Sequence, residues 1–341
     1  MNVWKKAVKL SIEKPIFRRI KEDEGNIMKL SLVIPCYNEE ENVELFYAEV
    51  NKSLEEKIKD YEFIFVNDGS KDKTMKKLKE IYKNRGDNNV KVIGFSRNFG
   101  KEAAIYAGMQ QAVGEYTTII DADLQQRPEV VLGMVKVLDE NEEYDCVAAF
   151  QEKRSEGKVL TFFKNAFYKI INKVADTEFI SGASDFRTFR SNMREAIIGM
   201  SEYHRFSKGI FSWVGFETKF IPYVAEKRNA GSSKWSFRKL FKYGMDGIIS
   251  FSVAPLKLAT WAGMISAWMS ILYMFVIFMQ KIFFGIDVPG HATIVTLILF
   301  LGGIQLFFLG ILGEYISKMY IQEKNRPIYI VRETLGGKNE A

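Results

Sequence analysis

Residues Thr118–Pro128 read TIIDADLQQRP, in which an apolar run is followed by two acids one residue apart, Asp121 and Asp123. The apolar run predicts a buried strand, so the two carboxylates would stand at its end. One interpretation is a solvated acidic turn. The other is a site for a divalent cation that holds a phosphorylated substrate, because oxygen ligands suit Mg²⁺ and Mn²⁺. The D-x-D spacing alone does not decide between them.

The surrounding sequence repeats one scheme. Segments 29–46, 61–74 and 90–114 each begin with an apolar, β-rich run that ends in a polar loop. Strands that alternate with helices predict an α/β domain with a mostly parallel sheet, whose ligands bind at the carboxyl ends of the strands. Four polar clusters would share that edge: Tyr37–Glu39, Asp68, Arg97–Asn98 and Asp121–Asp123. The chain has neither a P-loop nor a dinucleotide-binding fingerprint that would explain them.

The composition limits the remaining function classes. The 341 residues can bury a sizeable core, and a net charge of +6 suits a membrane surface, nucleic acid or a phosphorylated substrate. No recognised motif supports nucleic-acid binding, so we expect no such partner. Cys36, Cys146, His204 and His291 are the only cysteines and histidines. Their number and spacing predict neither a disulfide framework nor a zinc site, and a reducing compartment fits.

Two uncharged runs, 258–278 and 292–313, reach the ~20 residues that a helix needs to cross a bilayer. Buried core helices are the alternative, but two adjacent runs of this length favour a transmembrane pair. Lysines and arginines flank the pair on both outer sides, whereas the short link carries one lysine and one aspartate. The positive-inside rule therefore predicts a multi-pass protein of the cell (inner or plasma) membrane, with the α/β domain and both termini in the cytoplasm.

Two further segments are basic. Residues 234–251 alternate aromatic side chains with Lys and Arg, which predicts either a helix in the lipid headgroup region or an amphipathic helix packed on the sheet. Residues 1–28 place Trp4, Val8 and Ile12 at helical spacing beside lysines, which fits a membrane-surface helix or a disordered tail. The charges of this extension interrupt any apolar region of a signal peptide.

Eight stretches occur in the order found in one enzyme family. They are SLVIPCYNEEENV (31–43), FVNDGSKDKT (65–74), SRNFGKEAAIYAG (96–108), DADLQ (121–125), SDFRTF (184–189), RFSKGIFSWVGF (205–216), AGSSKWSF (230–237) and GEYISKMYIQEKNRPIY (313–329). Together they resemble glycosyltransferase family 2. More closely, they resemble its polyprenyl-phosphate (bactoprenol) glycosyltransferase group, which is related to dolichyl-phosphate mannose synthase. The resemblance implies a GT-A-type nucleotide-binding sheet flanked by helices, then an amphipathic interface helix and two transmembrane helices.

The resemblance, together with the charge and hydropathy patterns, predicts a chain of five parts. They are a basic N-terminal extension (1–28), a cytoplasmic GT-A catalytic domain (29–235), juxtamembrane interface helices (236–256), a two-helix transmembrane hairpin (257–314) and a cytoplasmic C-terminal tail (315–341).

The resemblance also implies donor-side residues. Nucleotide-sugar contacts would come from Pro35, Tyr37, Glu39, Asp68, Arg97, Asp121, Ala122 and Asp123. Of these, Asp68 would contact the nucleoside, and Asn67 stands where many members have a second acid. Asp121, Asp123 and Gln125 would bind the Mg²⁺ or Mn²⁺ cofactor.

On the acceptor side, the resemblance assigns Asp185 to activating or positioning the acceptor, and Asp185 and Asp123 would be the catalytic pair. An acid that caps a turn is the alternative interpretation of Asp185. The acceptor phosphate would be bound by Arg154, Arg187, Arg205, Lys208, Arg228 and Lys234. Gln126 and Arg127 replace an acid and a proline that are common in the family, a change that would affect the loop but not the ligands.

The implied reaction is an inverting hexosyl transfer (EC 2.4.1 type), with glucose moved from UDP-glucose to polyprenyl (undecaprenyl) phosphate for cell-envelope glycosylation. Because the second pKa of a phosphate lies near ~6, the acceptor hardly needs a general base at neutral pH. UDP-N-acetylglucosamine or GDP-mannose are alternative donors. A polysaccharide synthase is a second alternative, against which the missing Q-x-x-R-W element and the few membrane helices count. A non-catalytic membrane scaffold would not need the polar edge, and a homo-oligomer is compatible with the resemblance.

Overall fold

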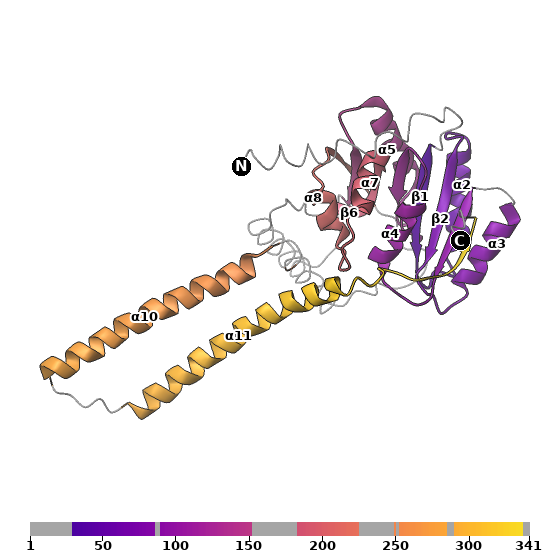
Figure 1. Ribbon diagram of the computed structural model, residues 1–341. Helices are drawn as coiled ribbons and strands as arrows, with labels where there is room; N and C mark the ends of the chain where they lie inside the picture. Colours follow the sequence, from indigo (N-terminus) through magenta and orange to yellow (C-terminus); the bar gives the residue numbers. More distant parts are fainter. Residues whose placement is uncertain are drawn as a thin grey trace.

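The computed structural model describes residues 29–85, 89–151, 183–224, 249, 252–284 and 290–336 (Figure 1). The predicted N-terminal extension lies outside these residues. So do residues 236–248, 250 and 251 of the predicted interface helices (236–256), whose position and form therefore remain predictions.

A mixed sheet forms the centre of the N-terminal domain. Its described strands are β1 (Leu30–Cys36), β2 (Tyr61–Asn67), β3 (Val90–Phe95), β4 (Tyr116–Ile119), β5 (Cys146–Gln151), β6 (Ala183–Arg190), β7 (Thr218–Tyr223) and β8 (Val331–Leu335). Their order across the sheet is β7-β5-β6-β4-β1-β2-β3-β8. Strands β1 to β4 are parallel, as are β5 and β7, whereas β6 and β8 run antiparallel to their neighbours. The predicted mostly parallel sheet is confirmed.

Helices cover both faces of this sheet (Figure 1). Their bounds are α2 (Val43–Glu55), α3 (Thr74–Arg85), α4 (Lys101–Gln111), α5 (Pro128–Glu140), α7 (Ser191–Ile198) and α8 (Ser207–Trp213). Helices α2, α3 and α5 share one apolar cluster with Leu32 and Ile34 of β1, while α4, α7 and α8 share another with Val33. Because successive strand residues point to opposite faces, the two clusters lie on the two sides of the sheet.

Helix α4 packs unusually close to β1. A Cβ atom on Gly108 would stand 2.3 Å from Cγ1 of Val33, so only glycine fits this helix position. The buried alanines Ala103, Ala104 and Ala107 extend the same small surface. Since α4 follows β3, its first residue, Lys101, lies at the carboxyl edge of the parallel strands.

Helices α10 (Ala254–Phe284) and α11 (His291–Glu323) leave the sheet domain as a long hairpin (Figure 1). Their candidate spans, Ala254–Phe283 and Thr296–Glu323, have mean hydropathies of 1.9 and 2.2, and 0% of the tested apolar stretch of either helix is buried. A helix in the core of a globular domain would instead be buried by the rest of that domain. The prediction of two apolar helices that could span a membrane is confirmed.

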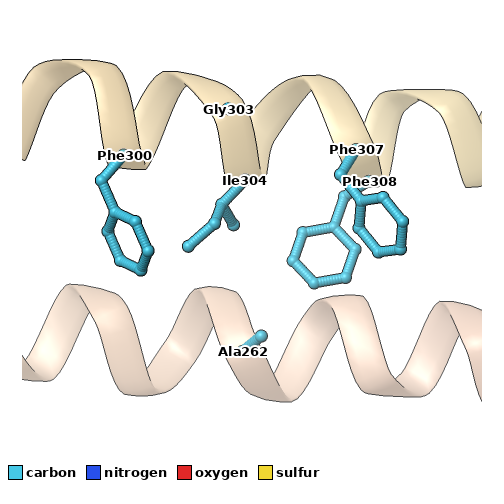
Figure 2. A pocket seen from close by; sticks show the side chains of 6 residues that line it. All are labelled: Ala262, Phe300, Gly303, Ile304, Phe307 and Phe308. Carbon is cyan, nitrogen blue, oxygen red and sulfur yellow. The ribbon is translucent and has the colours of Figure 1, made fainter.

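Between them, the two long helices leave an apolar space of about 430 Å³ (Figure 2). It is lined by Ala262, Phe300, Gly303, Ile304, Phe307 and Phe308. Figure 2 shows the side chains of Phe300, Ile304 and Phe308 extending from α11 toward α10, which contributes only the small Ala262. The two helices are also joined near the start of α10, where the Tyr315 hydroxyl of α11 donates to the Ser252 carbonyl at 2.7 Å.

The chain after α11 returns to the sheet, a feature that the sequence did not predict for residues 315–341. Strand β8 pairs antiparallel with β3, with Val92 opposite Leu335 and Gly94 opposite Glu333. Just before it, the Tyr329 ring stacks on Phe95 with centroids 4.8 Å apart. The segment predicted as a tail therefore anchors the hairpin to the edge of the sheet.

Candidate active site

The loops after β1, β2, β3 and β4 meet at one edge of the sheet, as predicted, and the beginning of β6 joins them there. Strand β6 pairs with β4 in a register that sets Ile119 opposite Arg187. Continuing this antiparallel register by two residues places Asp121 opposite Asp185. The structure thus brings together the predicted metal-binding acid and the predicted acceptor-side acid, which are far apart in the sequence.

The D-x-D loop is held rigidly at this edge. The Asp121 N–H donates to Oε1 of Gln126 at 2.9 Å, and Oδ1 of Asp123 accepts the Gln125 N–H at 3.2 Å. Leu124 has a φ of 58°, which is rare for a residue with a branched side chain, and it packs against the apolar cluster below. Ala122 is buried. Gln126, which replaces the family's usual acid, therefore closes the loop through its side chain.

The oxygen atoms of this loop suit a hard divalent cation. Within the described residues, no three acidic, histidine or cysteine side chains are grouped as a complete ligand set. Mg²⁺ commonly takes one or two carboxylates and completes its shell with water and substrate phosphate. Asp121 and Asp123, with the Gln125 amide, match that kind of site.

Lys101 connects the two acids that face each other across β4 and β6. Its Nζ atom lies 2.6 Å from Oδ1 of Asp121 and 3.5 Å from Oδ2 of Asp185. Partial desolvation of its ammonium lowers the pKa of Lys101, but Asp121 and Asp185 outweigh this effect and raise the pKa, so the side chain is cationic. Lys101 was not among the predicted site residues. Its position at the start of a helix that follows a strand-end loop was the available signal.

Asp68 shapes the loop after β3. Its carboxylate accepts the Phe99 N–H at 2.6 Å and the Gly100 N–H at 2.9 Å, and it is 3% exposed. Burial raises its pKa to about 6, although these backbone bonds and Arg97 act in the opposite direction. Gly69 is needed beside it, since its φ is 62° and an added Cβ would lie 2.3 Å from the Arg97 carbonyl carbon. Asp68 thus has a structural function, and a nucleoside contact stays a prediction.

The loop after β1 is locked to the loop after β2. The Glu39 N–H donates to Oγ1 of Thr74 at 2.8 Å, and the Asn38 N–H donates to Oγ of Ser70 at 3.0 Å. Pro35, Tyr37 and Glu39 are half-buried here. Arg97, in the neighbouring loop, is exposed and lies over the Phe99 ring at 4.0 Å. The predicted donor-side residues therefore share this edge, each on a short and well-supported loop.

Three cations surround Asp185. Burial pushes its pKa up, but Lys101, Lys208 and Arg187 outweigh burial and lower the pKa below its ordinary value. Its Oδ1 atom is buried and has no hydrogen-bond partner among the described residues. Asp185 is therefore a carboxylate with an unused acceptor atom, directed into a positively charged environment.

The predicted acceptor-side cations have different surroundings. Arg187 is 5% exposed, donates to the Ser184 carbonyl at 3.0 Å and lies over the Phe211 ring at 3.7 Å, so its charge acts on Asp185 from inside the domain. Lys208 is half-buried at the start of α8.

Arg205 has a capping role that the sequence did not predict. It donates to the carbonyl of Ile197 in the last turn of α7, at 3.2 Å, and to that of Met200 just beyond the helix. Its guanidinium lies 4.2 Å from the centre of the Tyr106 ring. Arg154, Arg228 and Lys234 lie outside the described residues.

Glu102 was also missed. It accepts hydrogen bonds from the backbone N–H of Ser207, at 3.0 Å, and from the hydroxyl of the same residue. Burial and the nearby Asp185 raise its pKa to about 7. Glu102 joins the start of α4 to the start of α8 and so supports the helices that carry Lys101 and Lys208.

Known proteins resemble this chain in both of its parts. Residues 31–198 match the model of glycosyl transferase family 2, and residues 254–319 match that of the GtrB C-terminal hairpin. The solved structure of glucosyl-3-phosphoglycerate synthase from Mycobacterium tuberculosis, in complex with Mn²⁺ and UDP, is 17% identical with a TM-score of 0.45, over 65% of this chain and 78% of that one.

Curated relatives match nearly the whole chain. A "putative glycosyltransferase CsbB" of Bacillus subtilis is 41% identical over 89% of this chain and 91% of its own length. An "uncharacterized glycosyltransferase sll0501" of Synechocystis is 41% identical over 91% and 96%. A "bactoprenol glucosyl transferase" of Shigella phage SfII is 39% identical over 91% and 99%. With identities of this size over whole sequences, the chain belongs to glycosyl transferase family 2.

Proposed function

We propose that the protein transfers a hexose, with glucose from UDP-glucose as the first candidate, to polyprenyl phosphate. One observation carries this proposal. A sheet edge that holds both acidic and basic side chains, as a site for a sugar nucleotide and a phosphate would need, is joined in one chain to an apolar helical hairpin. The similarity to proteins named bactoprenol glucosyl transferase covers both parts and supports the same reaction.

The donor would lie over the D-x-D loop. Asp121, Asp123 and Gln125 would hold Mg²⁺ or Mn²⁺ there, and the bound cation would offset charge on the leaving nucleoside diphosphate. The loops after β1 and β2, with Tyr37 and Asp68, would border the nucleoside. The rigid hydrogen bonding of these loops means that little has to be ordered when the donor binds.

The acceptor phosphate would approach from the side of Asp185. A phosphate oxygen would form a bond to the anomeric carbon as the bond from that carbon to the diphosphate oxygen breaks, with inversion in a single displacement. Because the phosphate is largely dianionic at neutral pH, Asp185 would orient it rather than remove a proton. Lys208 and the field of Arg187 would offset the repulsion between two polyanions, and we extend this role to Arg154, Arg228 and Lys234.

The hairpin would place this chemistry at a membrane. We propose that α10 and α11 cross the cell membrane, that residues 29–235 form the catalytic domain on the cytoplasmic side, and that both termini lie there. The pairing of β8 with β3 supports this topology for the C-terminal end, because β8 belongs to the same sheet as the active site. A lipid acceptor would keep its polyprenyl chain in the bilayer and present only its phosphate to the edge of the sheet that holds the proposed site.

Labelled sugar nucleotides test this proposal. Membranes containing the protein would be supplied with polyprenyl phosphate and, in parallel, with UDP-glucose, UDP-N-acetylglucosamine or GDP-mannose, and the lipid extract would be analysed by mass spectrometry. We expect an acid-labile hexosyl lipid whose formation requires added lipid phosphate. Label found only in polymer would indicate a polysaccharide synthase, and the absence of any lipid-linked product would contradict the proposal.

A further inference from the structure

The ammonium of Lys101 lies between Asp121, on the proposed donor side of the site, and Asp185, on the proposed acceptor side. It lies 2.6 Å and 2.9 Å from the two oxygens of Asp121, and 3.5 Å from Asp185. No other described lysine or arginine makes an ion pair with either acid within the distances of a salt bridge. Lys101 is thus the cation shared by the donor-side and acceptor-side carboxylates.

The backbone fixes where this lysine starts. Gly100, immediately before it, has a φ of 101° and donates its N–H to Asp68, and its carbonyl accepts the Ala104 N–H in the first turn of α4. The aliphatic part of the Lys101 side chain therefore begins at a defined point of this edge of the sheet. The side chain beyond it is 43% exposed, so its four-carbon stem can turn.

Lys101 and a divalent cation compete for the same carboxylate. A Mg²⁺ ion bound to Asp121 would stand about 2.0–2.1 Å from a carboxylate oxygen, and the lysine ammonium now lies close to both of these oxygens. Two cations so close repel each other strongly. Metal binding must therefore displace the ammonium from Asp121, while Asp185 remains within reach of the same stem.

We propose that Lys101 is a movable counter-charge, which holds Asp121 before the metal binds and then turns to a phosphate oxygen where donor and acceptor meet. The inference rests on the proposed function for its second half. A lysine binds phosphate as a compact point charge, which suits a group that must change partners during the reaction. Lys101 would then reduce the repulsion between the two polyanions at the point where the new bond forms.

The proposal predicts opposite effects of one substitution. In Lys101→Met the detergent-solubilised full-length protein should bind Mn²⁺ alone about fivefold more tightly or better, because the competitor for Asp121 is gone. Transfer at saturating Mn²⁺ should fall about 10²-fold, because a charge aimed at the reacting phosphates is lost. Lys101→Arg keeps the charge and should retain near-normal Mn²⁺ affinity and part of the transfer rate.

A second ion pair of similar exposure supplies the control. Lys29 lies 2.8 Å from Asp139, with 37% and 39% of the two side chains exposed, against 43% and 32% for Lys101 and Asp121. Lys29→Met removes a comparable pair from the far end of β1. It should change neither the Mn²⁺ affinity, followed by the electron paramagnetic resonance signal of free Mn²⁺, nor the transfer rate.

Two further measurements show whether Lys101 contacts the donor or the acceptor phosphate. They also test the competition with the metal separately from the phosphate contact. A weaker affinity of Lys101→Met for UDP at saturating Mn²⁺ assigns the lysine to the donor, whereas a raised KM for polyprenyl phosphate with unchanged UDP affinity assigns it to the acceptor. Unchanged or weaker Mn²⁺ binding in Lys101→Met overturns the competition, and unchanged transfer overturns the phosphate contact. If the wild-type protein makes no glycosyl lipid but Lys101→Met still binds Mn²⁺ more tightly, the proposed function fails while the competition stands.

Discussion

The backbone N–H of Tyr203 donates to Oε1 of Gln322 at 2.8 Å, and Nε2 of Gln322 donates in turn to the carbonyl of Ser201 at 3.1 Å. Gln322 lies in the last turn of α11, and the loop it contacts leads into α8, where Lys208 stands beside Asp185. Among the described residues, the long hairpin is therefore fixed to the sheet domain through this glutamine and through β8.

We expect Gln322→Ala to reduce lipid-dependent transfer about three- to tenfold without changing UDP binding. The substitution removes two hydrogen bonds worth about 0.5–1.5 kcal/mol each. The loop before α8, on the proposed acceptor side of the site, would then be held less firmly to the hairpin. Transfer in lipid vesicles and UDP affinity would be measured side by side. Lys324→Ala, which only removes a cation from the Tyr320 ring, is the control. Equal transfer rates in the two variants would show that the Gln322 contacts have no functional role.

Asp123→Ala should abolish transfer while the fold remains intact. The carboxylate lies in an edge loop, so its removal would take away a proposed metal ligand rather than core packing. We expect a loss of at least about 10²-fold in turnover, with a thermal midpoint within a few degrees of the wild type. Activity of the wild-type protein should also disappear in excess chelator and return with Mg²⁺ or Mn²⁺. Full activity in chelator would exclude metal dependence.

Asp185→Asn should lower turnover much more than donor affinity. The substitution keeps the size of the side chain but removes the negative charge that Lys101, Lys208 and Arg187 surround. If Asp185 orients the acceptor in the transition state, as proposed, kcat and kcat/KM should fall together. Titration with UDP and Mn²⁺ is the matching measurement. A variant that turns over normally but no longer binds UDP would place Asp185 on the donor side instead.

Glu102 predicts a pH-dependent difference in stability. Its folded pKa of about 7 lies above its ordinary value of 4.5, so its protonated form is favoured by folding. The stability from this group is fully present below about pH 4.5 and is lost as the pH rises through about 7. Glu102→Gln cannot ionise, so its thermal midpoint should rise relative to the wild type between pH 5 and pH 8. Parallel midpoints across that range would mean that Glu102 titrates normally.

The meeting of the strand-end loops could be predicted from the sequence more readily than the surroundings of Asp185. Strand-end loops follow each other along the chain, so their meeting at one edge follows from the alternation of strands and helices. The opposition of Asp121 and Asp185 depends on an antiparallel strand, β6, whose register no local pattern reveals. The sequence predicted Arg205 as a contact for the acceptor phosphate, and only its packing against Tyr106 and the end of α7 shows that it is buried.

The C-terminal strand was missed for a similar reason. VRETL is short and carries two charges, as edge strands often do, so it resembles a solvated tail. Its partner, β3, is distant in sequence. The pairing becomes visible only when the end of α11 is brought back to the sheet. The stacking of Tyr329 on Phe95, the bond from the Ser96 N–H to the Ile330 carbonyl and the β3–β8 pairing hold it there together.

Tyr329 offers a matched pair of substitutions that separates anchoring from chemistry. Its hydroxyl donates to Oε1 of Gln110 at 2.6 Å, and its ring stacks on Phe95. Tyr329→Phe loses only the hydrogen bond and should cost about 0.5–1.5 kcal/mol of stability, whereas Tyr329→Ala also loses the ring and should cost about 2 kcal/mol or more. If β8 holds the catalytic edge over the membrane, lipid transfer should fall in the same order while UDP binding stays constant. Thermal midpoints and vesicle assays on the two variants would test this order. Loss of UDP binding in Tyr329→Ala would instead mean that the C-terminal segment supports the sheet itself rather than its placement at the membrane.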